Sequence, residues 1–189
     1  TEGWHDAAFF NMCRPLEMVF SNGMDKGVQI SVQTGDVTEM KSFDEFYDAY
    51  KKQMEYFISL LVNADNAIDV AHAERCPLPF LSCMVDDCLK KGKSVQEGGA
   101  VYNFTGPQGF GIANMADGLF AVRQLVYDEK KISMKELKEA LIWNYDKGLD
   151  AQSARDIGTE ILKAMKAAGR NVDASTAAAV LNSLIGMKP

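Results

Sequence analysis

The sequence predicts an α/β fold that consists mainly of helices with a few short strands. Apolar residues recur every three or four positions over long stretches, which is typical of helices with one buried face. Two segments, 42–45 and 133–136, open with serine and place glutamate three residues later, a pattern that caps the start of a helix. With 189 residues, of which 47% are apolar, the chain can bury a core of its own.

The first half of the chain is expected to hold two helices and a short strand. Helical spacing of apolar residues predicts a helix over 7–21, with Pro15 bending it or delaying its start. Residues 28–32 alternate between apolar and polar and predict a strand. A long helix should follow the capping box at 42–45 and end before the Cys-Pro-Leu-Pro sequence at 76–79, because residues that precede proline leave the helical region. Its buried stripe is expected to be Phe46, Tyr50, Met54, Phe57 and Leu61.

Helices also dominate the predicted second half of the chain, with one strand among them. In order, we expect a helix over 80–90 that stops at Gly92, a strand over 100–104, a turn at 106–109, and helices over 112–127, from 133 onward, over 154–168 and over 174–184.

Composition and charge exclude several classes of function. Charged residues are interspersed and give a formal net charge of −6, whereas binding to nucleic acid needs clustered Lys and Arg. No apolar run approaches the roughly 20 residues of a membrane helix. The chain starts at Thr1 without an initiator methionine or an export signal, so we expect a cytoplasmic protein and a piece of something longer.

The cysteines are expected to be reduced, because the chain has a sizeable core and lacks an export signal. Most of them should pack as small hydrophobic residues. The four are Cys13, Cys76, Cys83 and Cys88. They form no Cys-x-x-Cys pair, and His5 and His72 are far apart in sequence, so no metal site is expected.

The first candidate site is the Glu-Gly-Trp-His-Asp sequence at 2–6. Two interpretations of Asp6 stay open from the residues alone. Asp6 either caps the helix expected to follow it, or it projects into a cavity and accepts hydrogen bonds from substrate hydroxyls. His5 beside it can act as an acid or base, although a lone histidine is more often structural.

Two further places can carry chemistry. The glycine-rich stretch 98–111 lacks the Gly-Lys-Ser/Thr of a phosphate loop, so we interpret it as a tightly packed turn beside a cavity. Asp65, Asp69 and His72 share one face of the long helix. A solvated or ion-paired face is the favoured interpretation there, with metal binding as the alternative.

Several blocks resemble, in order, the glycyl radical enzymes of the pyruvate formate-lyase-like family, in particular the B12-independent glycerol and propanediol dehydratases. The two most distinctive blocks read Thr-Glu-Gly-Trp-His-Asp-Ala-Ala-Phe-Phe-Asn at 1–11 and Gly-Gly-Ala-Val-Tyr-Asn-Phe-Thr-Gly-Pro-Gln-Gly at 98–109. The others lie at 41–46, 53–57, 64–75 and 78–82. The resemblance covers 1–144, whereas 145–189 form a divergent helical tail.

The resemblance implies a partial piece of a ten-stranded α/β barrel that catalyses anaerobic radical dehydration. In such enzymes a stored glycyl radical, installed by a radical SAM activating enzyme, generates a thiyl radical on a catalytic cysteine. By the resemblance, Asp6 is a substrate-binding residue, with His5 and Tyr102 as weaker candidates, and no metal is involved. The catalytic Cys-x-Glu should precede Thr1 and the radical glycine should follow Pro189, so no catalytic residue is expected in this chain.

The resemblance also implies partners and leaves two alternatives. The parent enzyme is expected to be a homodimer that acts on a small diol, in the cytoplasm or within a bacterial microcompartment. A choline-cleaving lyase is the nearest alternative, but the pair His5 and Asp6 favours a diol, because a quaternary ammonium needs an aromatic-lined site. A non-catalytic remnant or interaction module is the second alternative.

Overall fold

A computed structural model describes residues 3–147 and residue 163 of the chain. The chain divides into two compact units: residues 1–11 with 57–110, and residues 12–56 with 111 onward. The expected helices over 154–168 and 174–184 lie outside the described residues, apart from the helical residue Lys163. Within the described part of the chain, no helix is long and apolar enough to cross a membrane.

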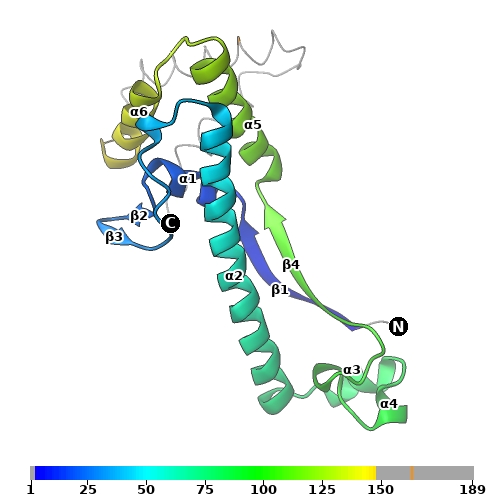
Figure 1. Cartoon of the computed structure of the whole chain (residues 1–189). Coiled ribbons are helices and arrows are strands. Elements are labelled where there is room, and N and C mark those ends of the chain that lie inside the picture. The colour runs from blue at the N-terminus through cyan, green and yellow to red at the C-terminus, as the bar shows by residue number, and fades with distance from the viewer. Residues whose placement is uncertain (1–2, 148–162, 164–189) are drawn as a thin grey trace. The chain divides into compact units, whose positions relative to one another are not determined.

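The first unit is built on a pair of parallel strands. Strand β1 (Gly3–Asn11) pairs with strand β4 (Asn103–Phe110), about a hundred residues later in the chain (Figure 1). Parallel strands cannot be joined by a tight turn, and here the connection contains long helical segments. Parallel strands with a helical crossover confirm the predicted α/β class.

The helix expected over 7–21 is wrong in its first half, because residues up to Asn11 form strand β1. The run Ala-Ala-Phe-Phe at 7–10 is continuously apolar, as parallel strands often are, and a short apolar run does not distinguish a strand from a helix. The second half is helix α1 (Arg14–Phe20), with Pro15 in its first turn. Pro15 therefore does delay the helix start, as expected.

The strand expected at 100–104 lies further along the chain, and the turn expected at 106–109 is wrong. Strand β4 continues through Gly106, Pro107 and Gly109. Glycine and proline are typical of turns, but pairing with β1 overrides that local preference here.

Helix α2 (Phe43–Arg75) forms as the sequence predicts. Ser42 Oγ accepts a hydrogen bond from the Glu45 N–H at 3.2 Å, and Glu45 Oε2 accepts one from the Lys41 N–H at 2.8 Å. The helix ends before Cys-Pro-Leu-Pro. In its predicted stripe Phe46 and Tyr50 are buried, whereas Met54, Phe57 and Leu61 are half-buried.

The helix expected over 80–90 is two short helices, α3 (Pro79–Met84) and α4 (Cys88–Lys91). Asp87 interrupts them with a positive φ of 72°, and Gly92 ends α4 as expected. A 3-10 turn, η2 (Val95–Glu97), follows. The small core of this region consists of Val85, Cys88, Val95 and Ala100.

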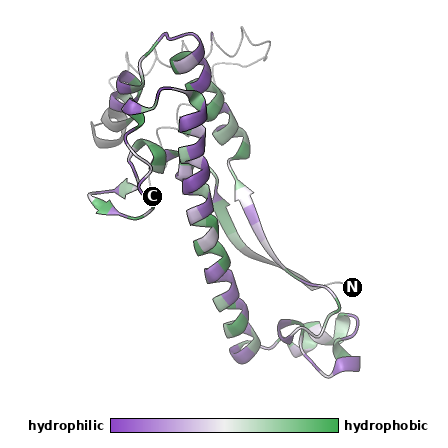
Figure 2. Cartoon of the chain, in the orientation of Figure 1, coloured by the Kyte–Doolittle hydropathy of each residue, from purple (hydrophilic) through white to green (hydrophobic). Residues whose placement is uncertain are grey.

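The second unit packs helices around an apolar core. It contains α1, the hairpin of β2 (Met24–Asp25) and β3 (Val28–Gln29), the 3-10 turn η1 (Val37–Glu39), the first part of α2, α5 (Ile112–Val122), the π-helical turn η3 (Arg123–Asp128) and α6 (Met134–Lys147). The strand predicted over 28–32 thus shortens to two residues. The helix predicted over 112–127 is confirmed as α5 and η3. Figure 2 shows apolar residues concentrated on α5, whereas polar and apolar residues alternate along α2.

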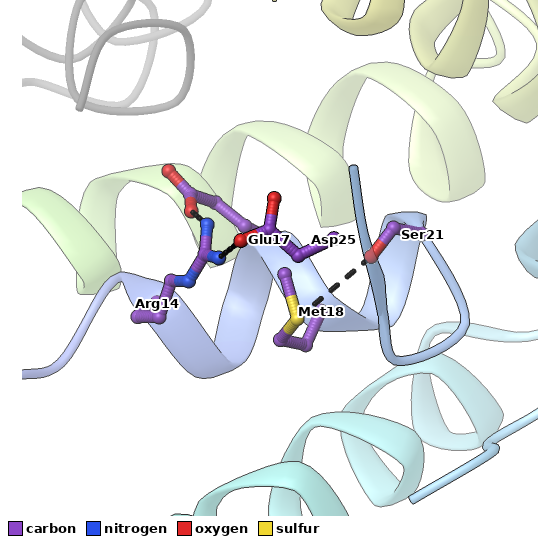
Figure 3. Close-up of polar contacts among 5 residues, drawn as sticks. All are labelled: Arg14, Glu17, Met18, Ser21 and Asp25. Atoms are coloured by element: carbon purple, nitrogen blue, oxygen red, sulfur yellow. Dashed lines mark hydrogen bonds and ion pairs between the residues drawn. The ribbon is translucent and has the colours of Figure 1, made fainter. Parts of the chain in front are cut away.

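An ion pair between Arg14 and Asp25 connects α1 to the hairpin. The Arg14 guanidinium contacts Glu17 at 2.7 Å and Asp25 at 2.6 Å, and Ser21 Oγ donates to the Met18 sulfur at 3.9 Å (Figure 3). Burial raises the pKa of the Glu17 carboxyl, and its contact with the Arg14 guanidinium opposes that shift.

None of the four cysteines forms a disulfide, in agreement with the expected reduced state. Cys13 and Cys88 are buried, whereas Cys76 and Cys83 are exposed. The expectation that most of them pack as small hydrophobic residues therefore holds for only two.

The second capping box provides a test of how α6 begins. Ser133 Oγ accepts from the Glu136 N–H at 3.2 Å, and Glu136 Oε2 accepts from the Ser133 N–H at 2.8 Å. We expect Ser133→Ala to lower the free energy of unfolding by about 1 kcal/mol, since it leaves a helix-terminal N–H without its acceptor. Urea unfolding of the full-length protein measures the loss, with exposed Glu139→Ala on the same helix as control. Equal losses in the two variants would contradict the capping role.

Candidate functional site

The backbone register brings together the two glycine-containing blocks that the sequence singles out. His5 pairs with Thr105, and Asp6 pairs with Gly106. The pairing of Asp6 means that the residue lies within a strand, and the first helix starts only at Arg14. The interpretation of Asp6 as a helix cap is therefore wrong.

The strand pairing is irregular immediately beyond Asp6. The register shifts between Asp6 and Ala8, so that Ala7 is skipped and Ala8 pairs with Pro107. Proline has no N–H to donate to a strand ladder, and within sheets it is tolerated at such irregularities. Bulges of this kind are frequent next to active sites, where they redirect side chains.

Helix α2 contacts one face of β4. Thr105 Oγ1 donates a hydrogen bond to Asp69 Oδ2 at 2.5 Å, which places the Thr105 side chain on the face toward α2. Successive residues of a strand alternate between faces, so Phe104 and Gly106 belong to the opposite face. Gly106, the pairing partner of Asp6, puts no side chain of its own on that face.

Aromatic side chains lie on both sides of Gly106 along the chain. Tyr102 stacks on Phe104 with ring centroids 6.0 Å apart and an interplanar angle of 10°. At the other end of β4, Phe9 and Phe110 meet edge to face at 4.9 Å. All four side chains are exposed in the described chain.

The glycines of the stretch 98–111 have the special geometry that the sequence indicates. Gly98 and Gly111 have positive φ values of 76°. A Cβ on Gly99 would lie 2.3 Å from the Lys93 carbonyl oxygen, so only glycine fits this close approach. The stretch thus serves tight packing before β4 and the start of α5 after it.

The acidic face of α2 differs from the prediction. Asp65 is buried and Asp69 is half-buried and bonded to Thr105, whereas His72 is exposed. The solvated interpretation is therefore wrong for Asp65, which is buried. The contact of Asp69 comes from a strand 36 residues later, which spacing within the helix does not reveal. Among the described residues, no group of three or more His, Cys, Asp or Glu side chains can hold a metal ion.

The first unit exposes several large apolar side chains. Phe80, Leu89 and Phe9 are 77%, 71% and 70% exposed. Large apolar side chains of α2 are exposed as well, namely Ile58, Leu60, Val62, Ile68 and Val70. Exposed apolar surface is one feature of interaction sites.

This chain belongs to the pyruvate formate lyase-like family, whose model matches residues 1–172. It is 41% identical over 145 residues to (2S)-3-sulfopropanediol dehydratase of Klebsiella oxytoca, covering 76% of this chain and 18% of that protein. A solved structure on 1,2-propanediol dehydration in Roseburia inulinivorans matches with 61% identity and a TM-score of 0.74, over 100% of this chain and 23% of that one. The glycerol-bound B12-independent glycerol dehydratase from Clostridium butyricum matches with 44% identity and a TM-score of 0.75, over 100% and 24%.

These comparisons confirm the recognised family and the fold class. The solved structures are glycyl radical enzyme barrels, and the helices and short strands of this chain match a part of them. Enzymes of this family use a glycyl radical. The chain spans about a fifth to a quarter of the length of the proteins it matches, from 18% to 24% in these three cases.

Proposed function

We propose that this chain is part of a glycyl radical diol dehydratase, which eliminates water from glycerol or propane-1,2-diol to give an aldehyde. The observation that carries the proposal is the pairing of Asp6 with Gly106 at an irregular point of a parallel strand pair. Paired residues of neighbouring strands share a face, and Gly106 adds no side chain of its own next to Asp6. The similar proteins whose names mention propanediol and glycerol support the substrate class.

The role proposed for Asp6 is to bind and orient the diol. A carboxylate enclosed in a cavity accepts hydrogen bonds from hydroxyl groups and discriminates against molecules that lack them, because its own desolvation is then uncompensated. A fixed orientation and exclusion of water are needed, since a substrate radical would otherwise react elsewhere.

The chemistry itself is assigned to groups elsewhere in a longer protein. We propose that a radical glycine, installed by a radical SAM enzyme, generates a thiyl radical on a catalytic cysteine. This cysteine and a glutamate then act on the diol that Asp6 holds. His5 and Tyr102 remain weaker candidates for substrate contact. The proposal includes a homodimeric parent enzyme in the cytoplasm or in a bacterial microcompartment, and anaerobic conditions.

A choline-cleaving lyase is the second candidate. Phe104 lies on the same face of β4 as Gly106, and the ring of Tyr102, just before the strand, stacks on it. Stacked aromatic rings of this kind attract a quaternary ammonium group. The exposed apolar surface of the first unit also fits a remnant that binds another protein. The coding sequence on both sides of this segment distinguishes the two possibilities. Stop codons there indicate a remnant, whereas Cys-x-Glu upstream and a radical glycine downstream indicate an enzyme.

Anaerobic turnover of the activated full-length protein tests the proposed function. We expect aldehyde and no trimethylamine when glycerol, propane-1,2-diol and choline are supplied in separate reactions. Electron paramagnetic resonance measures the glycyl radical in each sample, so that inactivity is not confused with failed activation. Turnover of choline alone, or no turnover of either diol by radical-containing protein, would contradict the diol dehydratase assignment.

A further inference from the structure

A short hydrogen bond joins α2 to β4 behind the proposed diol site. Thr105 donates to Asp69 at 2.5 Å, and both side chains are half-buried. A hydroxyl-to-carboxylate bond of this length is at the strong end of the range found in proteins. Because the two residues lie 36 positions apart, the bond fixes the strand to a separate element and not to its own neighbours.

The bond adjoins the irregularity in the pairing of β1 with β4. Thr105 immediately precedes Gly106, whose pairing partner is Asp6. The next residue, Pro107, cannot donate a ladder hydrogen bond, and the register shifts at the same point. The strand pairing is therefore interrupted at Pro107 and resumes beyond it, and the helix supplies a contact just before the interruption.

We propose that Asp69 is a positioning residue for the diol site. Its hydrogen bond fixes the position of β4 at Thr105. Because Gly106, the next residue, pairs with Asp6, the bond also fixes the position of the substrate-binding residue relative to the diol. Asp69 itself does not touch the substrate, since its bonding partner lies on the face of β4 opposite to Gly106. This inference rests on the proposed function of Asp6.

Substitutions in the full-length, activated enzyme test the role of this bond. Thr105→Val keeps the side-chain shape and removes the donor, Asp69→Ala removes the acceptor, and Thr105→Ser retains the hydroxyl. We expect the first two to lower kcat/KM for the diol about 10- to 100-fold, because small displacements of a positioning group are costly in catalysis. Thr105→Ser should stay close to the unsubstituted enzyme.

Two further readouts separate positioning from folding. Glycyl radical content and the thermal midpoint of Thr105→Val should match those of the unsubstituted enzyme. A fall in either that accounts for the lost activity would overturn the positioning role. If Asp69→Ala does not fold, Thr105→Val carries the test alone.

A double-mutant cycle with Asp6→Asn distinguishes the positioning role of Asp69 from the substrate-binding role of Asp6. If Asp69 acts through Asp6, Thr105→Val should cause little further loss in the Asp6→Asn background. Losses that multiply, or a large loss in Asp6→Asn alone with none in Thr105→Val, would overturn the positioning role and leave the diol site intact. Unchanged activity in Asp6→Asn would instead contradict the proposed function itself.

Discussion

Replacing Asp6 with asparagine is expected to lower kcat/KM of the full-length enzyme for propane-1,2-diol by about 100-fold or more. Asparagine keeps the size of the side chain but removes the negative charge, and hydrogen bonds to a charged acceptor are about twice as strong as those between neutral groups. The loss should affect the diol reaction without reducing the glycyl radical content. Anaerobic steady-state kinetics, with radical content measured on the same samples, provide the values.

Asp48→Asn is the matched control for this substitution. Asp48 is an exposed carboxylate on α2 that pairs with Lys51 at 2.6 Å, and such surface pairs contribute little to stability. Its variant should retain the activity of the unsubstituted enzyme. Equal activity in the Asp6 and Asp48 variants would remove Asp6 from the substrate site.

Truncation of Phe46 to alanine is expected to have the largest effect on stability, a loss of about 3–5 kcal/mol. The side chain is 0% exposed, and its ring lies 5.5 Å from that of Phe20 and 6.3 Å from that of Phe43. Removing it leaves a cavity in the core of the second unit, which the neighbouring helices fill only in part. Urea unfolding of the full-length protein, followed by a signal from this region, measures the loss.

Tyr47→Ala provides the comparison for the Phe46 substitution. Tyr47 is the next residue on α2 and also contacts aromatic rings, but it is 40% exposed. Its truncation opens no enclosed cavity and should cost less than half as much. A Phe46 variant as stable as the Tyr47 variant would mean that this core is not packed as described.

Elements that depend on local chemistry could be predicted from the sequence. Ser42 and Ser133 each mark a helix start, because a serine and a following glutamate satisfy N–H groups within one turn. The end of α2 is equally local, because Pro77 restricts the residue before it. Pro15 marks the start of α1 for a related reason. Proline has no N–H, and a helix tolerates this only in its first turn, where the N–H groups have no partner within the helix.

Elements that depend on distant partners could not be predicted in the same way. Strand β1 and the Gly-Pro-Gln-Gly part of β4 are strands because they pair with each other across about a hundred residues. The bond of Asp69 to Thr105 is likewise non-local. The role proposed for Asp6 rests on a resemblance between whole blocks, and only the strand register shows that Gly106 pairs with it.

The most direct test of the account is a crystal structure of the full-length protein with propane-1,2-diol or glycerol bound. We predict an Asp6 carboxylate oxygen about 2.6–3.2 Å from a substrate hydroxyl. A bound diol without contact to Asp6, or an Asp6 side chain that points into bulk water, would contradict it.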